Sequence, residues 1–146
     1  MRRQDWLLLL LALRDASEPL DPVRLQKGMF LFAREAHPPP AETYEFVAYD
    51  YGPFSVQIYW DLEEMADSGL ILAAPMPGYS WSRHLTTASG LARAQDTLDE
   101  MAPEARGRAA QLQQLKQGVL SLGFRDLLSH VYSRYPDFSD KSVFRA

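Results

Sequence analysis

The hydrophobic and polar positions of this chain predict a mostly helical fold. Apolar residues recur at steps of three and four in most segments, which is the spacing of one face of an α-helix. The first segment, residues 5–16, is apolar nearly all round, and a helix of that kind is expected at the centre of a fold. The predicted helices cover residues 5–16, 22–36, 55–68, 88–101, 103–122 and 124–135.

Short signals mark where several of these helices begin and end. Asp21 and Ser55 stand at helix starts, because such side chains accept hydrogen bonds from the free amides of a first turn. Thr86 or Thr87 has the same role ahead of residue 88. Gly69 follows the third predicted helix, where glycine commonly adopts the left-handed conformation that ends a helix.

The polar positions of two helices are assigned to solvent. In residues 22–36, Gln26 and Lys27 fall on the expected wet side, beside a broad apolar stripe. In residues 55–68, four apolar residues face inward at helical spacing, with two more beside them. The inward-facing residues are Ile58, Leu62, Met65 and Ala66, and those beside them are Val56 and Tyr59. The outer face of that helix is expected to carry four carboxylates and no lysine or arginine: Asp61, Glu63, Glu64 and Asp67.

Two stretches depart from helical spacing. Residues 44–50 are rich in aromatic side chains, which favour strands, and Gly52 with Pro53 is expected to end this strand at a sharp corner. Residues 70–74 and 79–85 are predicted as two more strands, joined by a turn from Pro75 to Gly78. A helix, a hairpin and a helix in that order is the outline of a winged helix.

The predicted fold class is therefore α+β and mostly helical, in a single domain over residues 1–146. A winged-helix-like core covers about residues 5–101 and contains a small antiparallel sheet. A C-terminal helical extension covers about residues 103–135, and a tail covers residues 136–146. A chain of 146 residues is long enough to bury one working core.

Composition indicates the compartment. Apolar content is 47% and charged content is 23%, both ordinary for a globular protein. The lack of cysteine excludes disulfides and fits a reducing compartment, so a cytoplasmic location is predicted. The first residues imitate a secretion signal, but Asp5 interrupts it and eight apolar residues are too few to span a bilayer. A buried helix without a membrane partner is the prediction.

The sequence contains no recognisable catalytic or metal-binding pattern. His37, His84 and His130 fall in different predicted elements without ligand spacing, and no nucleophile or phosphate-binding motif occurs. Glu63 and Glu64 are adjacent on a helix, so their side chains diverge. We therefore expect that the protein is not an enzyme and that it has no cofactor and no metal site.

The distribution of charge argues against DNA as the partner. Residues 1–74 hold six Lys and Arg against twelve Asp and Glu, and residues 75–146 hold nine against seven. A winged helix contacts bases with the helix before its wing, and here the carboxylates of that helix would meet phosphates. Gln57 alone could contact a base, and the wing offers only Arg83 and His84. Other basic side chains form weaker alternatives: Arg2 with Arg3, and Arg106, Arg108 with Lys116.

Aromatic residues concentrate around the corner, the following helix and the hairpin. Two interpretations stay open, in which these side chains either make the core or form an exposed rim or groove. In the second case they supply the contact area that is typical of protein interfaces. The residues are Tyr49, Tyr51, Phe54, Tyr59, Trp60, Tyr79 and Trp81.

Several short motifs occur in an order that resembles a known family. They are Leu25-Gln26-Lys27, Tyr51 to Ser55, Ser68 to Ile71, Leu85-Thr86 with Gly90, and Val131-Tyr132 with Tyr135-Pro136. Together they are similar to the Panacea domain, also called SocA-like, and to its YwgA-like relatives, over roughly Asp5 to Ser142. The Pro38 to Pro40 connector and the Gln-rich stretch from Gln111 to Gln117 depart from that pattern.

The resemblance implies a compact, mostly helical domain with a small sheet, which acts as the antitoxin partner of a toxin or as an adaptor that presents a toxin to a protease. The sequence as a whole predicts a non-enzymatic protein-binding module, whose partner is another protein or a second copy of this chain. The alternative is a winged-helix DNA-binding transcriptional regulator. The candidate partner-binding residues are Gln26, Lys27, Tyr49, Tyr51, Gly52, Pro53, Phe54, Tyr59 and Trp60.

Overall fold

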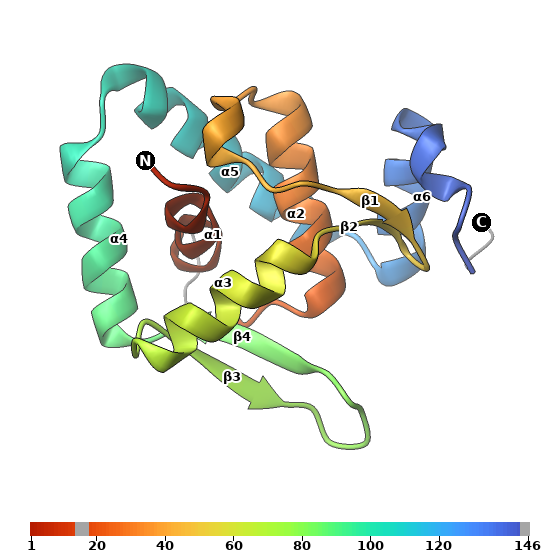
Figure 1. The fold of residues 1–146 in the computed structure, drawn as a ribbon, viewed down its shortest axis with the longest axis horizontal. Helices are drawn as coiled ribbons and strands as arrows, with labels where there is room; N and C mark the ends of the chain where they lie inside the picture. The colour runs from red at the N-terminus through yellow and green to blue at the C-terminus, as the bar shows by residue number, and fades with distance from the viewer. Residues whose placement is uncertain (14–17, 144–146) are drawn as a thin grey trace.

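The computed structural model describes residues 1–13 and 18–143, which form a mostly helical α+β fold (Figure 1). The predicted fold class, with its small antiparallel sheet structure, is confirmed. In chain order, with η for 3₁₀ helices, the elements are α1 (Arg3–Ala12), α2 (Pro22–Glu35), η1 (Pro40–Glu42), β1 (Val47–Tyr49), β2 (Gly52–Phe54), α3 (Val56–Asp67), β3 (Ile71–Pro75), β4 (Ser82–Thr86), α4 (Ala88–Glu100), α5 (Pro103–Ser121), α6 (Phe124–Arg134) and η2 (Pro136–Ser139).

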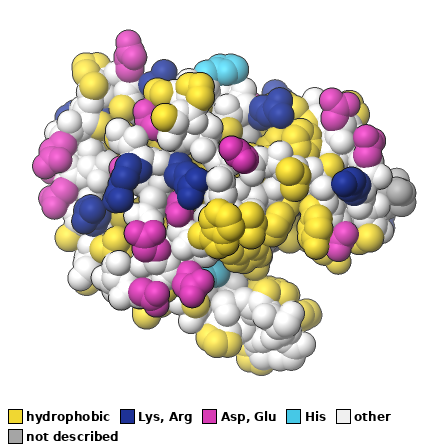
Figure 2. Space-filling view, viewed as in Figure 1, with side chains coloured by type: hydrophobic (Ala, Val, Ile, Leu, Met, Phe, Trp, Pro, Cys, Tyr) yellow, Lys and Arg dark blue, Asp and Glu magenta, His cyan; other side chains and the backbone are white. Residues whose placement is uncertain are grey.

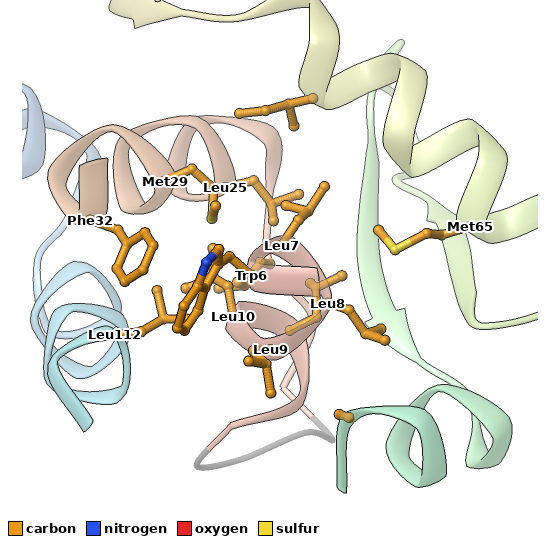
Figure 3. Close-up of a cluster of buried hydrophobic side chains, with 14 of the residues drawn as sticks. Trp6, Leu7, Leu8, Leu9, Leu10, Leu25, Met29, Phe32, Met65 and Leu112 are labelled. Atoms are coloured by element: carbon orange, nitrogen blue, oxygen red, sulfur yellow. The ribbon is translucent and has the colours of Figure 1, made fainter. Parts of the chain in front are cut away.

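Helix α1 lies at the centre, as its apolar sequence predicts. Residues Trp6 to Leu11 are all buried, and their side chains reach toward α2, α3 and α5 in different directions (Figure 3). The ring of Trp6 packs against Phe32 with centroids 4.8 Å apart. The helix ends at Ala12, earlier than predicted, and residues 14–16 of the predicted helix lie outside the described residues.

The first hairpin corrects the prediction of a strand that ends at a corner. Strands β1 and β2 pair antiparallel, with Ala48 opposite Pro53, and the chain turns back at Asp50 and Tyr51. Gly52 lies inside β2 with a φ of 95°, a left-handed conformation that favours glycine. Because Gly52 takes this conformation, the chain forms a tight hairpin before it enters α3.

The second hairpin, β3 with β4, is confirmed as a pair of antiparallel strands and projects from the body of the molecule (Figure 1). Its returning strand starts at Ser82 rather than at Tyr79, and Pro75 belongs to β3 rather than to the turn. Leu20, between α1 and α2, adds an isolated bridge to β4. Its amide donates to the His84 carbonyl and its carbonyl accepts from the His84 amide, both at 2.9 Å. The α1–α2 connection is therefore tied to the base of this hairpin.

Most of the predicted helix ends are confirmed, but the Ser55 side chain, predicted to cap α3, makes no capping hydrogen bond. The side chains of Asp21 and Thr87 accept hydrogen bonds from the first turns of α2 and α4. Gly69 has a φ of 78° just after α3, and the amide of Leu70 donates back to the carbonyl of Met65 at 2.9 Å. These ends were predictable because each depends on residues close together in sequence.

The C-terminal helices pack against α2 and cap other helices. Lys116, which was expected in an exposed basic group, is fully buried instead. Its Nζ donates to the carbonyls of Leu11 (3.1 Å) and Leu13 (2.6 Å) at the end of α1. Across the described residues, no helix has both the length and the apolar character to cross a bilayer. A second apolar cluster joins α2, α5 and α6: Phe30, Leu31, Val119, Leu127 and Val131.

Candidate functional site

An aromatic surface forms where the β1–β2 hairpin meets the start of α3. The rings of Tyr49 and Phe54 lie 5.1 Å apart between centroids, and those of Phe54 and Tyr59 lie 5.7 Å apart. Trp60 follows Tyr59, and Val56 lies one turn before it on α3. These five residues are named the aromatic face. Figure 2 shows hydrophobic side chains gathered over this part of the molecule.

The aromatic face is largely exposed, which decides between core and surface for these residues. Trp60 is 57% exposed, Tyr49 is 52% exposed, and Tyr59 and Val56 are also exposed. Phe54 is half-buried beneath them. Val56 and Tyr59 were expected beside the inward-facing residues of α3, so that prediction is wrong. Adjoining exposed rings present apolar surface to water, which is unfavourable unless a partner covers them.

The helical spacing of α3 places further exposed residues on the side that carries the aromatic face. Ile58, Leu62 and Met65 are buried on the inner side. The exposed positions repeat at steps of three and four along the other side. They are Val56, Tyr59, Trp60, Glu63, Glu64 and Asp67.

Two polar residues of α2 hold the hairpin from below, which corrects their predicted position in solvent. Gln26 is buried and bonds both backbone groups of Ser55: its Nε2 donates to the carbonyl (3.0 Å), and its Oε1 accepts from the amide (2.8 Å). Lys27 is buried and donates from Nζ to the carbonyl of Pro53 at 3.1 Å. Both satisfy backbone groups that a short hairpin leaves unpaired, so they support the aromatic face without contacting a partner.

The buried Lys27 makes stability depend on pH. Burial, partly offset by the charge of Asp21, lowers the pKa of Lys27 from 10.5 to about 8. Above the folded-state pKa the native protein has released this proton while the unfolded chain keeps it, so stability rises with pH up to about 10.5. Relative to the Lys27→Met variant, we expect the wild type to gain about 1.5 kcal/mol between pH 8 and pH 9.5.

Urea unfolding of both proteins across this pH range measures the difference. Comparison with Lys27→Met cancels the contribution of other groups, including Tyr44, Tyr59 and Tyr135, whose pKa values are raised chiefly by burial. Parallel stability curves for the two proteins would contradict the prediction.

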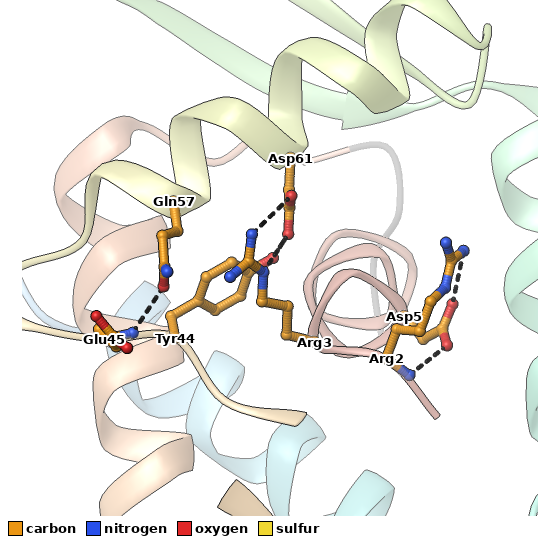
Figure 4. Close-up of polar contacts among 7 residues, drawn as sticks. All are labelled: Arg2, Arg3, Asp5, Tyr44, Glu45, Gln57 and Asp61. Atoms are coloured by element: carbon orange, nitrogen blue, oxygen red, sulfur yellow. Dashed lines mark hydrogen bonds and ion pairs between the residues drawn. The ribbon is translucent and has the colours of Figure 1, made fainter. Parts of the chain in front are cut away.

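Asp61 is not on the acidic outer face, where it was predicted. It is buried, and its carboxylate accepts a hydrogen bond from Tyr44 Oη at 2.6 Å and one from Arg3 Nε at 3.0 Å (Figure 4). Burial, and then the hydrogen bond to Asp61, raise the pKa of the Tyr44 hydroxyl. This cluster joins α1, the segment before β1 and α3, and so orients the helix that carries the aromatic face.

Gln57, the predicted base contact, is turned toward the protein. Its Oε1 accepts a hydrogen bond from the amide of Glu45 at 2.9 Å (Figure 4). This bond ties the start of α3 to the segment before β1. Gln57 therefore contributes to the scaffold of the aromatic face.

Tyr51, Gly52 and Pro53 lie apart from the aromatic face. The Tyr51 ring packs against Phe124 of α6 with centroids 5.6 Å apart. Gly52 and Pro53 are buried, and a Cβ on Gly52 would lie 2.9 Å from Cε1 of Tyr132. The structure thus brings Tyr49, Phe54, Tyr59 and Trp60 together from the predicted site. Tyr51 and Gly52 lie instead at the hairpin's junction with α6, and Pro53 is buried with its carbonyl bonded to Lys27.

Within the part of the chain that the structure describes, no group of three His, Cys, Asp or Glu side chains is placed to bind a metal ion. His84 lies in β4 of the second hairpin, and burial lowers the pKa of its imidazole. A pocket of about 270 Å³ lies beside the end of α2, and the described residues that line it include no histidine or carboxylate. Neither known family models nor curated proteins give a match to this chain.

Proposed function

We propose that this chain is a non-enzymatic protein-binding module and that its partner docks on the aromatic face. The observation that carries the proposal is the group of exposed rings on Tyr49, Tyr59 and Trp60, with Phe54 between Tyr49 and Tyr59. Tyrosine and tryptophan dominate interface energetics because they bring large contact areas at a low cost in conformational entropy.

The face is pre-organised for binding. Gln26 and Lys27 hold the hairpin from α2, and Asp61 holds α3 through Tyr44 and Arg3. Because these contacts already fix the backbone under the rings, a partner spends little free energy on ordering the surface. The resemblance to the Panacea domain agrees with this proposal and makes a toxin, in the cytoplasm, the favoured kind of partner.

The alternative is a winged-helix DNA-binding regulator, and one observation favours it. The helices α2 and α3 are followed by a projecting hairpin, with Leu20 bridged to β4, and this order of elements supports that alternative. The exposed side of α3 nevertheless carries Glu63, Glu64 and Asp67 and no lysine or arginine. Phosphate contacts require cations, so protein binding is the better supported function.

Site-specific crosslinking tests the proposal. A photo-crosslinking amino acid replaces Trp60 in the native host, and the matched control carries it at Leu91, an exposed apolar position on α4. We expect a specific adduct from position 60 only. With the captured partner purified, Trp60→Ala should weaken binding by about 2 kcal/mol, roughly thirtyfold, and Leu91→Ala should leave it unchanged.

The proposal fails if no specific adduct forms at position 60, and two other outcomes would also contradict it. One is equal adducts from both positions, which indicates unspecific contact. The other is sequence-dependent DNA binding by the purified protein that weakens steeply with salt, because phosphate neutralisation has that signature. The second outcome would support the regulator.

A further inference from the structure

The exposed side of α3 divides into two halves of different chemistry. Val56, Tyr59 and Trp60 occupy the first half, beside the β1–β2 hairpin. The second half presents only carboxylates to solvent: Glu63, Glu64 and Asp67. In Figure 2 hydrophobic side chains gather over the start of this helix and acidic ones toward its end. The helix has 12 residues and is about 18 Å long, so one partner segment can contact both halves.

The acidic half is unfavourable for the isolated fold. The last turn of α3 holds no basic residue, and carboxylates there lie at the negative end of the helix dipole. Asp67 is also four residues from Glu63 and three from Glu64, a spacing at which like charges repel. Within residues 1–13 and 18–143, none of the three forms an ion pair. A cation from outside the fold would relieve these costs.

A second copy of this chain that docked through its own α3 would not supply such a cation. Two antiparallel copies of α3 would bury the carboxylates of each against the rings of the other. Two parallel copies would set carboxylates against carboxylates. Both arrangements desolvate charge without pairing it, which is strongly unfavourable. Nucleic acid would add phosphate to the same acidic half.

We infer that the aromatic face and the acidic half of α3 together bind a cationic amphipathic helix of a partner protein. Apolar side chains of that helix cover Tyr59 and Trp60, and its lysines or arginines pair with Glu63, Glu64 and Asp67. A helix is the fitting shape because side-chain ridges of one helix pack into the grooves of another. The inference rests on the proposed function and adds the chemistry of the partner to it.

Selection from a displayed helix library tests the charge of the partner. The probe is a library of amphipathic helices of about 15 residues, with varied apolar positions on one face and polar positions drawn equally from Lys and Glu. Helices that bind the wild type are retained, and helices that also bind the Trp60→Ala variant are removed. We expect the enriched helices to carry a clear excess of lysine, concentrated toward one end.

A charge-matched pair of variants then tests the position of the contact. Glu63→Gln, Glu64→Gln and Asp67→Asn together should weaken a selected helix about tenfold, with a smaller effect at high salt. Asp96→Asn, Asp99→Asn and Glu100→Gln make the same change of charge on exposed positions near the end of α4, and should leave its binding unchanged.

The outcomes separate the inference from the function on which it rests. Enrichment of Glu-rich or charge-neutral helices, no enrichment at all, or equal loss in both triple variants would overturn the cationic helix. The protein-binding function would still stand if the crosslinking residue at position 60 captures a native partner. If no specific adduct forms at Trp60, the proposed function fails whatever the library yields.

Discussion

Replacing Arg3 with methionine should lower the free energy of unfolding by about 3 kcal/mol. Arg3 donates from Nε to Asp61 at 3.0 Å and from Nη2 at 3.4 Å, and the Asp61 side chain is only 8% exposed. Without the guanidinium, the buried carboxylate keeps one described hydrogen bond, from Tyr44. An unpaired buried charge is among the costliest defects that one substitution creates.

Arg2→Met is the matched control for this experiment. Arg2 lies next to Arg3 in sequence and is also ion-paired, 3.8 Å from Asp5, but its side chain is 61% exposed. Exposed pairs contribute little, so we expect a change within about 0.5 kcal/mol. Urea unfolding at neutral pH measures both variants. Equal losses would show that the buried pair has no special role.

A second substitution identifies the cause of the loss. Asp61→Asn in the Arg3→Met background removes the unpaired charge, while the amide oxygen can still accept from Tyr44. We expect the double variant to be more stable than Arg3→Met alone. If it is less stable, the loss comes from packing of the Arg3 side chain rather than from the stranded carboxylate.

Asp61 also shows why part of the candidate site escaped prediction. It was assigned to the outer face because it is a carboxylate in an acidic helix, although its spacing of three residues from Ile58 and four from Met65 places it on the inner side. Its partners are Arg3, 58 residues away, and Tyr44, 17 residues away. Burial of a polar side chain depends on such distant partners, and spacing along one helix carries no information about them.

The same reason explains the errors at Gln26, Lys27 and Lys116. Each was predicted in solvent from its polarity, and each is buried because it bonds backbone carbonyls or amides of a distant segment. The helices, their caps and the second hairpin were predictable because spacing and turn residues act locally. The β1–β2 hairpin was missed because three-residue strands leave hardly any alternation to detect.

The aromatic face lies between these two cases. Its residues were predictable as a cluster, since Tyr49, Phe54, Tyr59 and Trp60 are close in sequence. Their exposure was not, because apolar side chains at helical spacing fit a core equally well. The structure resolves this by filling the inner side of α3 with Ile58 and the residues that follow it at helical spacing.

Replacing Gly90 with alanine should cost about 3 kcal/mol or more, and lower the melting temperature by roughly 10 °C. A Cβ at Gly90 would lie 2.0 Å from the carbonyl oxygen of Leu70, which already accepts from the amide of Thr87 at 3.0 Å. The clash is with backbone, so no side-chain rotation relieves it. Either α4 or the chain entering β3 must move, and Ile71 in β3 belongs to the core.

Gly107→Ala and Gly118→Ala are the matched controls, because both glycines lie inside α5 and a Cβ on either would meet nothing within 4 Å. Alanine is the better helix former, so each change should stabilise the protein by about 0.5–1 kcal/mol. Opposite signs for the same substitution would isolate the contact between Gly90 and Leu70 as the cause. A stabilising effect of Gly90→Ala would mean that α4 does not approach the base of the second hairpin this closely. In that case the hairpin would not lie beside α3 as it does in this structure, and a partner could not contact both in that arrangement.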